Sequence, residues 1–296
     1  MMRWIRRLLI VLAIGVGVIL VGLFAALRDN PARPVAGELR VAQGDEAAIQ
    51  YAASGPGAGA VIVLLPSFAR SASDFNELVG ALNEEGYRTL AVQPRGVEGS
   101  ELPSLQGTLH TYAADVTAVL DAEGVSEPAV IAGHAFGNRI ARTFASDYPE
   151  RTRALILLAA GGSDPTPPEI GNAILLAMLK IVPDARRREA IDLAFFAEGN
   201  PVPDSWLRGW YPVAGVAEQT ASAATPYAEW GAGGDAPILV LQALEDAVAM
   251  RGGMQLKKRF PRRVRLREIP NSGHAILPEQ PSRVNAEVIG YLETLP

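Results

Sequence analysis

The clearest chemical signal is a short turn between an apolar run and a helical segment. Residues 129–132 are apolar, and a turn from Gly133 to Gly137 follows, with Ala135 at its centre. Glycines on both sides let the chain turn tightly enough to hold the central residue at the edge of a sheet. The N–H groups of a starting helix favour a negatively charged oxygen at the same place. The turn is therefore a candidate catalytic position, although alanine carries no nucleophile.

This segment resembles the nucleophile elbow of α/β-hydrolases, which usually reads G-x-S-x-G. Residues 239–249 resemble the family's strand and loop that carry the catalytic acid, here Asp246. Residues 270–274 resemble the loop that carries the catalytic histidine, here His274. Elbow, acid and histidine follow one another in the family's order, and the resemblance extends from residue 38 to the C-terminus.

Residues 66–71 align with the family's oxyanion loop, in which Pro66 and Ser67 replace the usual His-Gly pair. The resemblance implies an oxyanion hole made by the backbone N–H groups of Phe68 and Phe136. In this fold Ser67 faces the same cleft as the elbow, so it is a candidate surrogate nucleophile or a residue that positions water for His274. The alternative is that its hydroxyl caps its own loop.

Alanine at the elbow excludes an acyl-enzyme at this position, because a methyl group cannot attack a carbonyl. Three explanations fit: an engineered Ser→Ala change that traps a substrate, a native alanine in a pseudo-enzyme that only binds, or a native alanine in an enzyme that uses other groups. The string G-H-A-F-G-N and the Pro-Ser loop resemble a branch of the family that has alanine here, so we favour a native Ala135.

The retained Asp246 and His274 favour chemistry without a serine. A histidine held by a carboxylate is a general base, able to activate water or a substrate proton. The expected function is hydrolysis of a small ester or related acyl substrate. The alternatives are an inactive pseudo-enzyme that binds a small apolar ligand, in which the pair is only structural, and an engineered inactive esterase.

Composition narrows the remaining functions. The chain has no cysteine, which excludes disulfides, thiolate metal sites and a cysteine nucleophile. Its histidines are isolated in sequence, so no metal is expected, and no phosphate loop or dinucleotide fingerprint implies a cofactor. A net charge of −5 gives no electrostatic footprint for nucleic acid. His110, His134 beside the elbow, and the R-G-x-G-x-S-like turn at 94–100, with Glu98 at its second glycine, are expected to be structural.

Alternating apolar runs and helical segments predict the scaffold. Such an alternation indicates a mostly parallel sheet covered by helices on both faces, hence an α/β class, and the resemblance implies the α/β-hydrolase fold over 38–296. Strands are expected at 38–43 and 47–52 (a hairpin), 60–65, 88–92, 129–132, 154–159, 237–241 and 264–269, and helices at 72–85, 112–123, 137–148 and 282–295.

Residues 163–236 interrupt that alternation and are expected to form an inserted helical lid. The segment contains three of the four tryptophans of the chain. Trp206, Trp210 and Tyr211 are candidates to line an apolar substrate pocket, since ligand sites are lined mainly by apolar and aromatic groups. The alternative is that these aromatic side chains pack the insertion against the core.

The N-terminus has the pattern of a membrane anchor. Residues 8–27 carry no charge and no proline, which is about the length that a helix needs to cross a bilayer. Three arginines precede the run, and positive flanks stay in the cytoplasm. We therefore expect an anchor at 1–30, a linker at 31–37 and a globular domain outside the cytoplasm. The alternative is a cleaved signal peptide and a secreted protein.

Overall fold

The computed structural model describes Gly22 and residues 26–296, and its centre is an eight-stranded sheet with the order β1-β2-β4-β3-β5-β6-β7-β8. The hairpin β1 (Glu38–Gln43) and β2 (Ala48–Ser54) is antiparallel, and β2 joins β4 in the same sense. All other pairs are parallel, among β3 (Val61–Leu65), β4 (Arg88–Val92), β5 (Ala129–His134), β6 (Thr152–Leu158), β7 (Ile238–Ala243) and β8 (Val264–Ile269). The mostly parallel sheet predicted from the sequence is confirmed.

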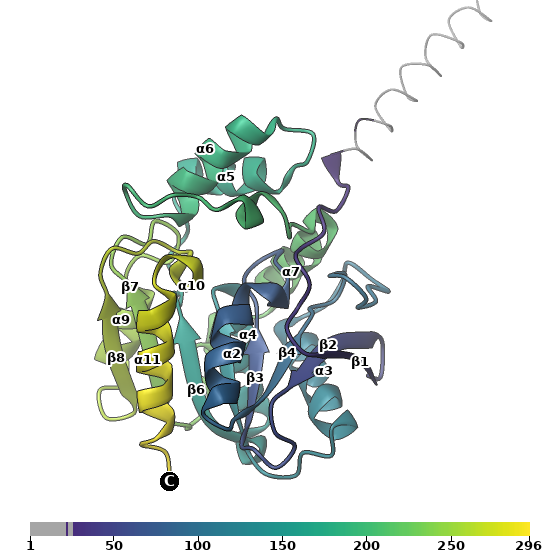
Figure 1. The fold of residues 1–296 in the computed structure, drawn as a ribbon, viewed down its shortest axis with the longest axis vertical. Coiled ribbons are helices and arrows are strands. Elements are labelled where there is room, and N and C mark those ends of the chain that lie inside the picture. Colours follow the sequence, from purple (N-terminus) through teal and green to yellow (C-terminus); the bar gives the residue numbers. More distant parts are fainter. Residues whose placement is uncertain (1–21, 23–25) are drawn as a thin grey trace, which may run out of the picture.

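Helices cover both faces of this sheet (Figure 1). One face packs against α2 (Asn76–Glu84) and α11 (Pro281–Leu292), and the other against α3 (Leu109–Ala122), α4 (Phe136–Asp147) and α9 (Gly252–Arg259). Along β5, Val130 and Ala132 pack on the face covered by α2 and α11, whereas Ala129 and Ile131 pack on the face covered by α3, α4 and α9. Because both faces of each central strand are buried, the strands read as continuous apolar runs.

Several element bounds differ from the expected ones for local reasons. Helix α3 begins at Leu109 rather than Tyr112, because Thr108 and Thr111 form a capping box. The expected helix at 72–85 starts as a 3-10 turn, η1 (Ala72–Phe75). Two helices, α9 and α10 (Ile276–Glu279), were not expected. Helix α9 begins with two glycines and buries one large apolar side chain, so it has no clear apolar periodicity.

The segment between β6 and β7 is helical, with α5 (Pro168–Met178), α6 (Asp184–Phe195), η3 (Asp204–Leu207), α7 (Pro212–Ala224) and α8 (Tyr227–Trp230). We call residues 163–236 the helical insertion. Its helices α5 and α6 lie side by side, beyond the ends of the strands (Figure 1). The N–H of Asn30 donates to the carbonyl of Trp210 at 3.0 Å, so the start of the described chain is attached to this insertion.

Most of the expected anchor, residues 8–27, falls on residues 1–21 and 23–25, outside the described residues. Within Gly22 and 26–296, no helix has both the length and the apolar character needed to cross a membrane.

The turn at 94–100 is structural, as predicted. The guanidinium of Arg95 donates to both carboxylate oxygens of Asp115 at 2.8 Å, and this buried pair joins the turn to α3. Glu98, at the place of the family's second glycine, has a φ of 49°. Its carboxylate accepts hydrogen bonds from the Tyr211 hydroxyl and from the N–H of Ala32.

The elbow is pressed against the end of β3, backbone to backbone. A Cβ on Gly137 would lie 2.1 Å from the carbonyl oxygen of Leu65, and one on Gly133 would lie 2.2 Å from that of Gly137. The N–H of Gly137 donates to the carbonyl of Pro66 at 3.0 Å. Between the two glycines, Ala135 has φ 49° and ψ −105°. Such a conformation persists only where the surroundings enforce it.

Helix α7 of the insertion holds the loop that follows β3. The carboxyl group of Glu218 is fully buried and accepts a hydrogen bond from the N–H of Ala69 at 2.6 Å. Its second oxygen, Oε1, has no partner among the described residues. Burial raises the pKa of Glu218 from 4.5 to about 8. The side chain therefore carries its proton at neutral pH and positions the loop as a neutral group.

Replacing Gly137 with alanine should destabilise the fold, because the new Cβ would collide with backbone rather than with a movable side chain. We expect the free energy of unfolding to fall by at least about 3 kcal/mol in urea denaturation. Gly80→Ala in α2 is the matched control, since its Cβ would meet nothing within 4 Å; it should gain about 0.5–1 kcal/mol. If Gly137→Ala unfolds at the same urea concentration as the wild type, the close backbone contact at the elbow is contradicted.

Glu218→Gln should change how stability depends on pH. The unfolded chain releases the Glu218 proton near pH 4.5 and the folded chain near pH 8, so the wild type loses stability as pH rises through this window. Glutamine does not titrate. Relative to the wild type, Glu218→Gln should therefore gain about 4 kcal/mol between pH 4.5 and pH 8. Denaturation at several pH values measures this difference in the free energy of unfolding. The exposed Glu84→Gln is the control, and its difference from the wild type should not change with pH. A pH-independent difference for Glu218→Gln would refute the buried proton.

Candidate active site

Asp246 and His274 meet at the edge of the sheet, although they come from the loops after two different strands, β7 and β8. The Nδ1 atom of His274 lies 3.0 Å from each carboxylate oxygen of Asp246. Oδ1 of Asp246 also accepts hydrogen bonds from the N–H groups of Val248 and Ala249, at 2.9 and 2.7 Å. The carboxylate can only accept, so Nδ1 carries the hydrogen and Nε2 is the basic nitrogen. The hydrogen bond expected from the sequence is present.

The His274 loop is fixed by buried neighbours. His134 donates from Nε2 to the carbonyl oxygen of His274 at 2.7 Å. Burial, and then the nearby charge of His274, lower the pKa of His134 to about 4, so it is neutral at pH 7. Glu279 accepts from the N–H groups of Gly273 and Ala197, which joins the histidine loop to the insertion. His134 is thus the packing and hydrogen-bonding residue expected from the sequence.

The two residues expected to supply the backbone donors of an oxyanion hole line the same pocket as His274. Phe136 opens α4, where a helix leaves its first N–H groups without an intrahelical partner. Phe68 lies in the loop after β3, which Glu218 holds through Ala69. Both residues line the same pocket as His274, and their rings meet edge to face at 6.5 Å. The N–H groups are therefore near the elbow, where a developing negative oxygen would need them.

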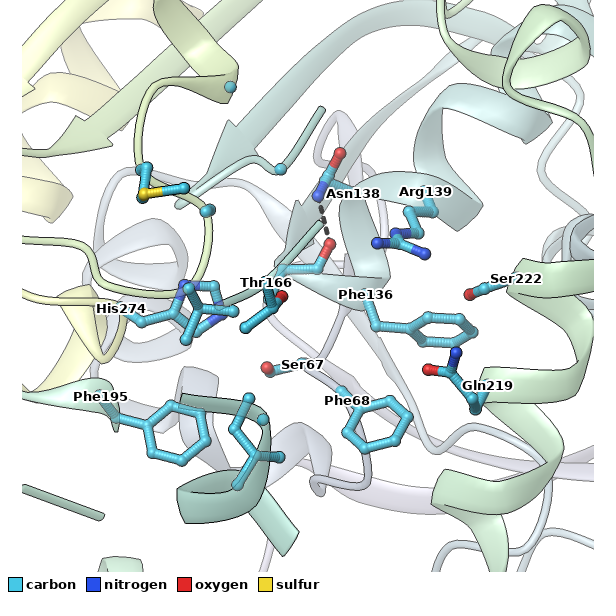
Figure 2. A pocket seen from close by; sticks show the side chains of 18 of the residues that line it. Ser67, Phe68, Phe136, Asn138, Arg139, Thr166, Phe195, Gln219, Ser222 and His274 are labelled. Atoms are coloured by element: carbon cyan, nitrogen blue, oxygen red, sulfur yellow. Dashed lines mark hydrogen bonds between the residues drawn. The ribbon is translucent and has the colours of Figure 1, made fainter. Parts of the chain in front are cut away.

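Ala135 and Ser67 belong to the same pocket as His274, Phe68 and Phe136. Both line the pocket, and Ser67 is 3% exposed. Figure 2 shows the Ser67 hydroxyl turned into the pocket on the side of His274, with no hydrogen bond drawn between the two. The carbonyl of Ser67 accepts the N–H of Arg70 at 3.1 Å. Figure 2 draws no hydrogen bond between Ser67 and His274, so the two side chains are not in direct hydrogen-bond contact.

The pocket itself lies between the elbow and the insertion, with a cavity volume of about 340 Å³. This is within the range of small-molecule sites. Its apolar wall is made by Phe68, Phe136, Ile174, Met178, Phe195 and Met250. The ring of Phe195 lies 5.9 Å from that of His274 and covers it from the insertion side. The site can therefore hold a small, largely apolar molecule against the basic nitrogen.

The aromatic residues expected to contact substrate lie elsewhere, which corrects that expectation. Trp206, Trp210 and Tyr211 are 3%, 0% and 2% exposed and are not among the residues that line the pocket. The guanidinium of Arg70 lies against both indole rings, 4.5 and 4.6 Å from their centroids, and the two rings meet edge to face. Tyr211 bonds to Glu98. Their role is the alternative named from the sequence, packing of the insertion against the core.

Three polar residues at the pocket were not expected from the sequence. Arg139 comes from α4, and Gln219 and Ser222 come from α7 (Figure 2). The available sequence signal for Arg139 was a charged residue one helical turn after the elbow. An arginine on the protein surface would give the same sequence pattern. Glu218 had a clearer signal, because it shares a helix face with Ala214, Ala217 and Ala221, which are all buried.

In the described part of the chain, no group of three or more histidine, cysteine or acidic side chains is placed to hold a metal ion.

Comparisons with known proteins agree with this architecture. Epoxide hydrolase B of Mycobacterium tuberculosis is 33% identical over 100 residues, which cover 33% of this chain and 28% of that protein. A 2-hydroxy-6-oxononadienedioate/2-hydroxy-6-oxononatrienedioate hydrolase of Comamonas testosteroni is 30% identical over 136 residues, 45% of this chain and 40% of that one. The chain thus spans less than half the length of these relatives. The crystal structure of an esterase from Rhodococcus sp. ECU1013 superposes with a TM-score of 0.73 at 22% identity, over 87% of this chain and 99% of that chain.

The sequence model described as "Alpha/beta hydrolase family" matches residues 62–287. That range contains the elbow, the loop after β3, Asp246 and His274. The fold class expected from the sequence is confirmed, and the chain belongs to the α/β-hydrolase family.

Proposed function

We propose that the protein hydrolyses a small ester or related acyl compound, using the Asp246–His274 pair to activate water directly. The observation that carries this proposal is the buried pair, with Nε2 of His274 on a pocket next to a methyl group instead of a hydroxyl. The family's mechanism needs the histidine to deprotonate a serine. At Ala135 the proton donor that remains available is water.

The reaction follows from the positions of these groups. Nε2 of His274 takes a proton from water, and the water oxygen bonds to the acyl carbon of the substrate. The carbonyl oxygen becomes negative and accepts hydrogen bonds from the N–H groups of Phe68 and Phe136. When the tetrahedral intermediate collapses, the bond to the leaving alcohol breaks and the proton on His274 passes to that oxygen. One ester and one water give one acid and one alcohol.

A binding function is the second candidate, and Ala135 itself favours it. The oxyanion donors, the pair and the pocket could all serve to hold an acyl compound that is never cleaved. In that case the missing hydroxyl is the reason for the lack of turnover. The two functions differ in one measurable property, the turnover of the protein with alanine at position 135.

Hydrolysis should depend on His274. With 4-nitrophenyl acetate and butyrate, and with spontaneous hydrolysis subtracted, His274→Ala should lower kcat/KM by at least about 100-fold, because the general base is lost. His110→Ala is the matched control. That histidine hydrogen-bonds Asp147 and Glu229, outside the pocket, and its loss should leave turnover unchanged.

Ala135→Ser separates the two candidates in the same assay. Turnover by the wild type, without labelling by a fluorophosphonate, supports water activation. Turnover and labelling only in Ala135→Ser would reject the hydrolase proposal in favour of binding.

Ser67 should assist the water without forming a covalent bond to the acyl group. We expect Ser67→Ala to lower kcat about tenfold with little change in KM, since one hydrogen bond to the attacking water is lost. Mass spectrometry of the wild type after fluorophosphonate treatment provides the check. A label on Ser67 would make it the nucleophile, and an unchanged kcat in Ser67→Ala would leave it without a catalytic role.

A further inference from the structure

The end of the pocket away from His274 is polar and positively charged. Figure 2 shows Arg139, Gln219 and Ser222 gathered there, with Phe136 between them and the middle of the pocket. The one hydrogen bond drawn among these pocket residues joins Asn138 to Ala135, so Arg139, Gln219 and Ser222 are not bonded to one another or to the other residues drawn. Three polar side chains from two helices therefore converge on the cavity with their hydrogen-bonding groups available.

Arg139 has no acidic partner among the described residues. Its guanidinium lies over the ring of Trp230 at 5.5 Å. Burial lowers the pKa of Arg139, and no neighbouring carboxylate contributes to offset that cost. Two buried arginines do have such a partner: Arg70 pairs with Asp74 at 2.6 Å, and Arg95 pairs with Asp115 at 2.8 Å. Arg139 is half-buried, so a guanidinium without an acidic partner on this pocket wall is placed to bind an anionic ligand.

A second positive charge lies next to it. Arg142 is 1% exposed and is also held by neutral groups only, among the residues described. It donates to the carbonyl oxygens of Gly161 and Gly231, the amide oxygen of Asn138 and the hydroxyl of Tyr227. The charge of Arg139 helps to lower the pKa of Arg142, after the larger effect of burial. Arg142 does not line the pocket, but its positive charge lies close to Arg139 and makes this end of the pocket more favourable for an anion.

The acidic groups nearest to the pocket do not neutralise it. Asp246 is engaged with His274 at the opposite end. Asp164 also lines the pocket, but it forms no ion pair with Arg139 and does not contribute to the pKa of Arg139. Glu218, although adjacent to Gln219 in sequence, is buried on another face of α7, and burial raises its pKa to about 8, so it is neutral at pH 7. The positive charge of Arg139 is thus left for a ligand.

We propose that Arg139, with Gln219 and Ser222, binds a carboxylate of the substrate at the end of the pocket remote from the reacting acyl group. The guanidinium fork matches a carboxylate in shape and charge. Resting on the proposed hydrolysis, this assigns the substrate class as monoesters of small dicarboxylic acids. The ester carbonyl lies at the elbow and the free carboxylate lies one helical turn further along α4.

Binding tests this without relying on turnover. The probes are N-benzyl monoamides of the dicarboxylic acids from malonic to adipic acid, whose amide bond resists hydrolysis, each compared with a neutral N-benzyl alkanamide of equal length. We expect the wild type to bind at least one anionic probe about 10- to 100-fold more tightly than its neutral match in calorimetry. Equal affinity for both members of every pair, or no binding of any acid, would overturn the proposal.

Variants locate the charge that is responsible. Arg139→Gln should reduce the affinity for the anionic probe to that of the neutral one and leave the neutral probe within about twofold. Arg139→Lys should retain part of the preference, because it keeps the charge but loses the fork. Arg186→Gln, an exposed arginine on α6, is the control and should bind like the wild type. Wild-type preference for the anion in both Arg139 variants would place the anion site elsewhere.

The binding measurement tests the carboxylate site, and the hydrolysis assay tests the proposed hydrolysis, so the two proposals can fail separately. Selective binding of the acid without turnover of 4-nitrophenyl glutarate would keep the carboxylate site and reject the proposed hydrolysis. Turnover without charge selectivity, in the wild type and in Arg139→Gln alike, would keep the hydrolysis and reject the carboxylate site.

Discussion

The candidate site depends on one close contact, in which the elbow after β5 meets the backbone at the end of β3. Gly137 touches the carbonyl oxygen of Leu65 and donates to that of Pro66, an approach that leaves no space for a side chain. The parallel pairing of β3 with β5 sets the distance between the two strand ends. The positive φ of Ala135 is the consequence, and the strand pairing on both sides of β5 stabilises it. The same contact brings the N–H groups of Phe68 and Phe136 to one side of the pocket.

Around this contact, buried ionisable groups are used in their neutral forms. His134 holds the carbonyl of His274, and Glu218 holds the loop of Phe68 through Ala69. Burial moves the pKa of each toward the uncharged species, to about 4 and about 8. Neutral supports position the loops without adding charge to the pocket. The local electrostatic field is therefore left to the Asp246–His274 pair at one end and to Arg139 at the other.

The other parts of the proposed hydrolase site do not depend on a serine at position 135. The backbone donors belong to the elbow and to the loop after β3, so they do not depend on the side chain at position 135. The pair of Asp246 and His274 is likewise built by the ends of β7 and β8. In the proposed mechanism, an alanine here excludes covalent catalysis at position 135, while the backbone donors and the histidine supply the charge stabilisation and the general base that water activation requires.

The sequence by itself determined the fold, the elbow, Asp246 and His274, because these are local features at strand ends in a fixed chain order. Gly133 and Gly137 flank the turn, and Gly273 stands before the histidine; each is a position where close backbone contact excludes a side chain. Tertiary structure decided which side chains face the pocket. Trp206 and Trp210 pack against Arg70, whereas Arg139 reaches the cavity with no acidic partner among the described residues. The physical reason is that contacts between residues far apart in sequence, such as Glu218 with Ala69, set how the insertion packs on the core. That packing determines which side of each helix faces the pocket.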